Sequence, residues 1–210
     1  MKNFWERDVS LCTISQLEKI VCEIGLVKDN RFSYGDLYQK YVRNDSGGMY
    51  QIPLQFAEFI HFLSFKKIDS IFNIGSHNGW TITFLTHYLQ CVKKDKINVI
   101  SIDIKHNSYK ELPDVGIKFE TGTSDGFVGQ YYDLCLIDGC HLYDWVKKDY
   151  DNVGRHSKIC MFHDINDQFC NGVVKFYDEI SVGRIHKEFL YHPNGDNVMG
   201  IGVIEKLCFM

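Results

Sequence analysis

The sequence lacks the patterns that mark membrane proteins, secreted proteins and small zinc-binding domains. Its 210 residues contain no apolar run of membrane-spanning length without charges. The first ten residues are charged and lack the apolar core of a signal peptide. The eight cysteines form no C-x-x-C pair, which argues against a zinc ribbon or a thioredoxin-like centre. Several cysteines fall inside apolar runs, so we expect reduced, buried thiols in a cytoplasmic protein with no membrane span.

An excess of positive charge is also missing. Lysine and arginine number 23 against 27 aspartates and glutamates, giving a net charge of −4. A nucleic-acid partner is therefore not expected, because such proteins carry a broad basic surface. No internal repeat or low-complexity tract is present, and 45% of the residues are hydrophobic. Residues 1–210 are predicted to form one domain with one core.

The first third of the sequence has helical periodicity. Thr13 and Gln16 have the spacing of a capping box, and apolar residues then repeat on one helical face up to Gly25. Further helices are predicted over 33–43 and, beginning at Pro53, over 53–65, with a loop at 44–48. We expect residues 1–66 to form an N-terminal helical cap.

From residue 68 onward, short apolar runs alternate with helix-like stretches. The alternation is typical of an α/β fold, in which a parallel sheet carries helices on both faces. Residues 67–210 are therefore predicted to be the core, with ligands at the carboxyl ends of its strands. The predicted strands are 68–74, 97–103, 117–121, 132–138, 158–164, 185–191 and 199–205, and the predicted helices are 80–92, 107–112, 142–153 and 169–180.

Polar side chains stand at these carboxyl ends. Asn73 and Asp103 come at the ends of the first two predicted strands, and His163 and Asp164 end a later one. Asp138 ends the apolar run "LCLI" and is followed by a glycine. A buried strand gains nothing from a carboxylate at its tip, so these residues indicate a functional site at one edge of the sheet.

The loop after the first strand, "NIGSHNG" at 73–79, contains Gly75 and Gly79. Gly75 permits a tight turn and Gly79 a close approach of backbone to ligand, although many α/β proteins use such glycines for geometry alone. Asp103, 28 residues after Gly75, is placed to accept both hydroxyls of a ribose. The G-x-G-x-x-G fingerprint and the P-loop are both absent. This combination favours S-adenosylmethionine over a dinucleotide as the cofactor.

Five segments resemble, in order and spacing, the class I S-adenosylmethionine-dependent methyltransferases. They are "IFNIGSHNGWTITFL", "VISIDI", "YDLCLIDGCHLYDWVKKDYDNV", "ICMFHDI" and "MGIGVI". Within that class the sequence is similar to cephalosporin-hydroxylase-like and sugar or macrolide O-methyltransferases, and also to catechol-type enzymes. The resemblance covers residues 50–205, and "IDGxH" followed by "HD" one strand later is its most specific part. It implies a Rossmann-like, mostly parallel sheet of seven strands whose last strand is antiparallel.

The resemblance implies a cofactor site built from several segments. The family places an acidic residue two positions before the first glycine of the loop, where this chain has Asn73. An asparagine accepts a hydrogen bond but brings no negative charge. The resemblance also implies that Ser124 and Asp125 flank the adenine and that Gln51 and Gln55 lie over the cofactor. The expected cofactor contacts are Gln51, Asn73, Gly75, Ser76, Gly79, Asp103, Ser124, Asp125 and Asp138.

The resemblance implies a metal site as well. In metal-dependent members, the acid ending the fourth strand and the polar pair ending the fifth hold one divalent cation; here these are Asp138, His163 and Asp164. Carboxylates suggest Mg²⁺, and the imidazole also permits Mn²⁺ or another transition metal. Such a cation lowers the pKa of an acceptor hydroxyl. Alternatively, His163 only forms a hydrogen bond to a neighbouring loop. In that case either Asp138 and Asp164 alone bind the metal, or no metal binds.

Asp138 and His141 are the predicted catalytic residues. His141 is interpreted either as the general base or as a contact to the cofactor or the loop. The predicted reaction is O-methylation of a small hydroxylated molecule or of a sugar unit in a glycan. Two other functions stay open: a non-catalytic binding module on the same fold, which Asn73 favours, and a metal-dependent hydrolase that uses the same strand-end acids.

Overall fold

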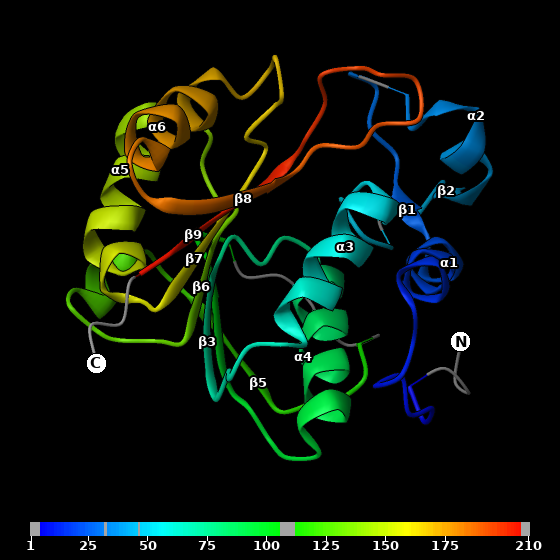
Figure 1. Ribbon diagram of the computed structural model, residues 1–210, viewed down its shortest axis with the longest axis horizontal. Helices are drawn as coiled ribbons and strands as arrows, with labels where there is room; N and C mark the ends of the chain where they lie inside the picture. The colour runs from blue at the N-terminus through cyan, green and yellow to red at the C-terminus, as the bar shows by residue number, and fades with distance from the viewer. Residues whose placement is uncertain (1–4, 32, 46, 106–111, 207–210) are drawn as a thin grey trace.

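A seven-stranded sheet forms the middle layer of the molecule in the computed structural model (Figure 1), which describes residues 5–31, 33–45, 47–105 and 112–206. The strand order is β5-β4-β3-β6-β7-β9-β8, and β9 alone runs opposite to the other six strands. The α/β class, the mostly parallel sheet and the antiparallel last strand are thereby confirmed. The strands are β3 (Ser70–Ile74), β4 (Asn98–Asp103), β5 (Ile117–Thr121), β6 (Leu134–Ile137), β7 (Ile159–His163), β8 (Ile185–Phe189) and β9 (Ile201–Glu205).

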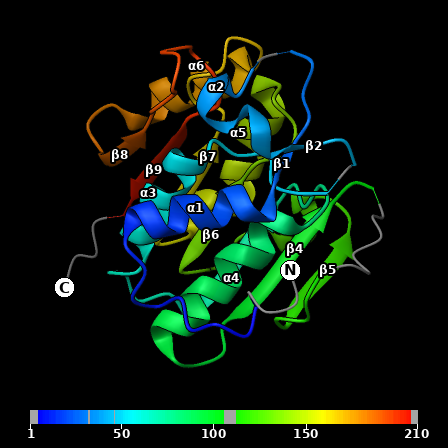
Figure 2. The ribbon, with the colours of Figure 1, turned by 90° about the vertical axis from the view of Figure 1, so that its right-hand side faces the viewer.

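Helices cover both faces of this sheet (Figures 1 and 2). On one face lie α3 (Pro53–Leu63) and α4 (Trp80–Lys93), and α1 (Ile14–Ile24) packs against α3. On the other face lie α5 (Tyr143–Asn152) and α6 (Asn171–Ser181). Successive residues of β6 enter opposite layers: Leu134 and Leu136 join the first, Cys135 and Ile137 the second. All four residues of β6 are therefore apolar, as in a strand that is buried on both faces.

The first helix begins at the predicted cap. Thr13 Oγ1 accepts the backbone N–H of Gln16, and the Gln16 side chain accepts the backbone N–H of Thr13. Leu17 and Val21 are fully buried, and Gly25 ends the helix with φ +100°. The predicted capping box is confirmed.

The prediction of a single helix over 33–43 is wrong. Only α2 (Gly35–Tyr38) and one 3₁₀ turn (Gln39–Tyr41) are helical there. Val42–Arg43 form β2, which pairs in parallel with β1 (Leu26–Val27). Met49 donates its backbone N–H to Gly25 O at 2.8 Å, which places a third segment beside β1. A two-residue strand has no periodicity that a sequence pattern can reveal.

The other elements lie within a few residues of their predicted bounds. Short 3₁₀ turns at Ser124–Phe127 and Gly154–His156 join them. Most of the helix predicted over 107–112 lies outside the described residues. The boundary between cap and core at residues 66 and 67 stays a prediction. Within the described part of the chain, no helix has both the length and the apolar content needed to cross a bilayer.

Candidate functional site

A cavity of about 700 Å³ lies at the carboxyl ends of the central strands. The polar residues that end β4, β6 and β7 all open into it, as the strand alternation predicts. A second cavity of about 630 Å³ lies between α5, α6 and β8, away from these strand ends. The first cavity is lined by Arg31, Tyr50, Ile74, Gly75, His77, Ile102–Lys105, Gly122–Ser124, Asp138–His141, Trp145, Asp149, His163 and Asp164.

The turn after β3 is packed directly onto the end of β6. Gly75 has φ +93°, and a Cβ at this position would lie 2.0 Å from the carbonyl oxygen of Asp138. Asp138 in turn donates its backbone N–H to Ile74 O at 2.9 Å. Gly79 stands at the N-cap of α4 with φ +81° but does not line the cavity. The glycine at 75 is required because no side chain fits between the two strand ends.

Asp103 stands at the rim of the cavity on the tip of β4. Its Oδ2 accepts the backbone N–H of His77 at 2.9 Å, and its Oδ1 accepts that of Lys105 at 3.0 Å. These two bonds fix the carboxylate beside the glycine turn, and each oxygen keeps capacity to accept a further bond. The contact of Asp103 with a ribose stays a prediction, and the place of Asp103 at the cavity rim suits it.

Asn73 is buried and does not line the cavity. Its amide donates to Ser101 Oγ at 2.8 Å, and Ser76 Oγ lies 2.7 Å from the same hydroxyl. All three side chains are buried, so they form a neutral polar network beneath the glycine turn. At the position where the family resemblance implies an acidic residue, this chain has Asn73, and the amide of Asn73 is hydrogen-bonded to Ser101.

Two cofactor contacts are expected in the segment after β5, Ser124 and Asp125, and only Ser124 lines the cavity. Ser124 lines it and is fully buried, with its hydroxyl donating to Asp149 Oδ1 at 2.6 Å. Asp125 does not line it; its carboxylate pairs with Lys148 at 2.7 Å. Gln51 also lies outside the lining, and its fully buried amide has no hydrogen-bond partner among the described residues.

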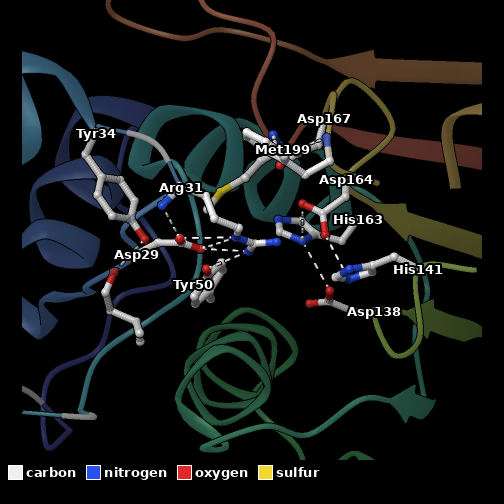
Figure 3. A network of polar contacts seen from close by, with 12 residues as sticks. Asp29, Arg31, Tyr34, Tyr50, Asp138, His141, His163, Asp164, Asp167 and Met199 are labelled. Atoms are coloured by element: carbon white, nitrogen blue, oxygen red, sulfur yellow. Dashed lines mark hydrogen bonds and ion pairs between the residues drawn. The ribbon is translucent and has the colours of Figure 1, made fainter. Parts of the chain in front are cut away.

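The ends of β6 and β7 bring three of the predicted ligands together (Figure 3). Nδ1 of His163 lies 3.1 Å from Oδ1 of Asp138 and 3.3 Å from Oδ1 of Asp164. Neighbouring ligands on an octahedral ion of the size of Mg²⁺ are roughly 3 Å apart. Asp164 adopts the left-handed conformation, φ +63°, which is uncommon for a residue other than glycine and is often found at functional sites. The donor set and its spacing fit a divalent cation.

His141 joins the same cluster from the loop after β6. Its Nε2 lies 3.1 Å from Oδ2 of Asp164, and its side chain is about one-third exposed. The hydrogen bond with Asp164 raises the pKa of His141 above its usual range. Burial alone would lower the pKa of His163, but the carboxylates of Asp138 and Asp164 outweigh burial and raise it. The carboxylates therefore favour the protonated form of both imidazoles.

Two further residues at the site carry no sequence signal. Arg31 lines the cavity between Asp29 and the cluster (Figure 3). Its guanidinium donates three hydrogen bonds to the Asp29 carboxylate and one to Tyr50 Oη at 2.8 Å. Cys170 is buried, and its Sγ lies within 4.8 Å of ligand atoms of His141 and Asp164. Arg31 comes from a loop more than a hundred residues before β6, so only the fold reveals its place. A lone cysteine after "HDINDQF" has no recognisable spacing.

Solved methyltransferases share this fold. TomG from Streptomyces achromogenes, an O-methyltransferase involved in tomaymycin synthesis and solved with S-adenosylmethionine, is 11% identical, with a TM-score of 0.53 over 75% of this chain and 82% of its own. The methyltransferase PaMTH1 from Podospora anserina, solved with S-adenosylhomocysteine, is 15% identical, with a TM-score of 0.51 over 75% of this chain and 79% of its own. No protein-family model and no curated protein matches the chain.

The fold is therefore that of the class I S-adenosylmethionine-dependent methyltransferases, as the sequence resemblance implies. At such low identities the likeness establishes the fold alone. Function has to be argued from the site.

Proposed function

We propose that this protein is a cytoplasmic, S-adenosylmethionine-dependent O-methyltransferase, assisted by Mg²⁺ or Mn²⁺, that acts on a small hydroxylated molecule or a sugar unit. One observation carries the proposal. A single cavity holds the glycine turn and Asp103 beside the cluster of Asp138, His163 and Asp164. Cofactor and acceptor can therefore meet there, and holding two reactants in one cavity is a large part of catalysis by methyl transfer.

The cofactor side of the cavity comprises the glycine turn, Asp103 and Ser124. When bound, S-adenosylmethionine supplies an electrophilic methyl group on a sulfonium. Asp103 accepts the ribose hydroxyls, because its carboxylate is already held at the rim by two backbone N–H groups. Gly75 keeps the turn close to β6 and itself lines the cavity.

The acceptor side comprises the strand-end cluster. Asp138, His163 and Asp164 hold the cation, which, when bound, lowers the pKa of the acceptor hydroxyl. His141 takes up the proton: its Nε2 faces Asp164, which leaves Nδ1 to accept. Asp164 orients the imidazole of His141 as it helps to hold the cation.

The N-terminal cap supplies the opposite wall. Arg31 and Tyr50 line the cavity and are joined by a hydrogen bond, and Asp29 fixes the guanidinium. These side chains come from the segments before α3, so the cap shapes the choice of acceptor. The cysteines support a reducing compartment: the seven in the described residues are all free thiols, although Cys135 and Cys160 are direct partners on β6 and β7.

The experiment that tests the proposal is a calorimetric titration of S-adenosylhomocysteine into the folded protein in chelator, with wild type and Asp103→Ala. We expect binding in the micromolar range for the wild type, and a loss of about a hundredfold for Asp103→Ala, since two hydrogen bonds to a charged group are removed. Asp114→Ala is the control; Asp114 does not line the cavity.

No binding to the folded wild type would contradict the proposal. Mn²⁺ binding without nucleoside binding would favour the hydrolase, which uses the same acids. If wild type and Asp103→Ala bind S-adenosylhomocysteine with equal affinity, the assignment of Asp103 to the ribose is wrong, but the proposed cofactor stands.

A further inference from the structure

Cys170 is a buried thiol beside the strand-end cluster that the proposed function does not use. It stands at the N-cap of α6 and is only 1% exposed. Its backbone N–H donates to Asp167 O at 2.9 Å, and its carbonyl accepts the backbone N–H of Val173 at 2.9 Å. These bonds fix the backbone of Cys170 and therefore hold its side chain beside Asp164 and His141.

The two oxygens of Asp164 face different imidazoles (Figure 3). Oδ1 lies 3.3 Å from Nδ1 of His163, and Oδ2 lies 3.1 Å from Nε2 of His141. A carboxylate has lone pairs on both oxygens and can serve two partners at once. The oxygen next to His163 belongs to the cation site proposed above, which leaves Oδ2 available on the side of His141.

A second set of possible metal ligands lies on that side. Ligand atoms of His141, Asp164 and Cys170 all lie within 4.8 Å of one another, in a group that does not include Asp138. Zinc bonds of about 2.0–2.3 Å in a tetrahedron place neighbouring ligand atoms roughly 3.3–3.8 Å apart, so a small rotation of the thiol suffices. A thiolate with an imidazole selects zinc, whereas Mg²⁺ and Mn²⁺ prefer oxygen ligands.

The surroundings leave one position on such an ion open. Asp167 is buried nearby, but both of its oxygens already accept backbone N–H groups, at 2.8 and 3.2 Å. His141 and Asp164 line the cavity, whereas Cys170 does not. An ion held by these three side chains would therefore turn its fourth position toward the cavity. Three protein ligands and one open position are typical of accessible zinc sites.

We propose that Nε2 of His141, Oδ2 of Asp164 and Sγ of Cys170 form a second metal site that takes Zn²⁺, with Asp164 as the bridge between the two sites. On binding, Zn²⁺ replaces the protons on Nε2 of His141 and on Sγ of Cys170, and both protons go to solvent.

Occupation of this site would block the proposed base. With zinc on Nε2, the remaining ring proton of His141 sits on Nδ1, the atom that would otherwise accept the proton of the acceptor hydroxyl. Zn²⁺ is therefore expected to inhibit methyl transfer. This consequence rests on the proposed function, whereas the binding site itself does not.

The test is a titration of the full chain with Co²⁺, a coloured substitute for Zn²⁺, in a phosphine reductant and excess Mg²⁺. We expect an intense thiolate-to-cobalt absorption band that saturates at one equivalent and disappears when Zn²⁺ is added. Cys170→Ser should lose the band and bind Zn²⁺ at least about a hundredfold more weakly, because even the loss of an outer partner of a metal ligand costs about 10- to 100-fold. Asp138→Ala should keep the band.

Cys91→Ser is the matched control, because Sγ of Cys91 lies 3.8 Å from Nε2 of His87 and forms a thiol–imidazole pair on α4. It should show the wild-type band. His141→Gln is a second variant of the site: its side chain is about one-third exposed, so the fold should tolerate the change, and Zn²⁺ should bind at least about tenfold more weakly.

The absence of a thiolate band in the wild type would overturn the inference, and so would a band that survives Cys170→Ser or is lost in Cys91→Ser. If Cys170→Ser does not fold, His141→Gln decides, and unchanged Zn²⁺ affinity in that variant counts against the site. Failure of S-adenosylhomocysteine to bind would contradict the proposed function and leave this zinc site standing, so the two failures are distinguishable.

Discussion

A single buried carboxylate can oppose folding. Asp149 is buried, is held by Ser124 and has no cationic partner among the described residues. Burial raises its pKa, so the ionised form is less favourable in the folded protein than in the unfolded chain. The ligand-free protein therefore carries a destabilising charge that a hydrogen-bond donor in the cavity would offset.

The ligand-free Asp149→Asn protein is expected to be more stable than wild type at pH 7. Because the folded pKa lies above the unfolded one, the carboxylate destabilises the fold above the folded pKa and ceases to do so below its ordinary value of 3.8. We expect a Tm about 2 °C higher at pH 7, with the difference narrowing as the pH falls. Thermal unfolding followed by circular dichroism from pH 8 to 4.5 measures it. A less stable variant across this range would show that the Asn loses the Ser124 bond.

The strand-tip residues that line the cavity could be predicted from the sequence, and Asp149 on α5 could not. Asp103, Asp138 and His163 line the cavity because strand alternation fixes which residue stands at each carboxyl end. The helix "YDWVKKDYDN" holds three aspartates, and its pattern does not show which one is buried. Asp149 is chosen by its contact with Ser124, 25 residues earlier, which only the packed fold provides.

At the scale of elements, the turn between β3 and α4 determines how closely two strands of the site approach. Gly75 donates its backbone N–H to Ile102 O at 2.9 Å on one side and faces the Asp138 carbonyl on the other. The turn is thus held between β4 and β6, the two strands that end in Asp103 and lead into Asp138. Its shape sets the distance between the proposed cofactor contact and the proposed cation site.

Gly75→Ala is expected to abolish S-adenosylhomocysteine binding and to destabilise the fold by about 2 kcal/mol or more, since a Cβ would lie 2.0 Å from backbone and φ is +93°. Gly126→Ala is the matched control, because a Cβ there meets nothing within 4 Å. Calorimetry and urea unfolding measure both variants. Wild-type behaviour of Gly75→Ala would mean that the two strand ends separate easily.

Longer elements were predictable from sequence, and the shortest were not. α1 and α4 have capped or strongly apolar patterns over several turns, and both begin at the predicted residue. β1 and β2 have two residues each, and beside them Gly48 packs against the Gly25 carbonyl, where a Cβ would lie only 2.5 Å away. That contact joins residues 23 positions apart and leaves no mark on either local pattern.

At the scale of the whole molecule, the proposed cation links the ends of two strands that are connected in the chain only through a whole helix. Asp138 ends β6 and His163 ends β7, with α5 between them in sequence. A ligand that binds only the folded arrangement raises the stability of the entire domain by mass action.

Mn²⁺ at about a hundred times its dissociation constant is therefore expected to stabilise the wild type by about 2.7 kcal/mol and to raise its Tm by several degrees. Asp138→Ala should lose this Mn²⁺ effect and retain most of the stabilisation by S-adenosylhomocysteine. Asp144→Ala, an exposed acid outside the cavity lining, should respond like the wild type. Thermal shifts with each ligand measure this. An undiminished Mn²⁺ effect in Asp138→Ala would place the cation elsewhere.

The order of the sheet has a consequence for how the chain is completed during synthesis. β9 follows β8 in sequence but lies between β7 and β8 in space, and β8 pairs with β9 alone among the described strands. While the ribosome has not yet released residues 201–205, β8 has no partner and the edge of β7 is open. A nascent or truncated chain that stops before Ile201 would thus expose an unpaired β8 and one open edge of β7, which are templates for aggregation. The last strand made is the one that closes the sheet.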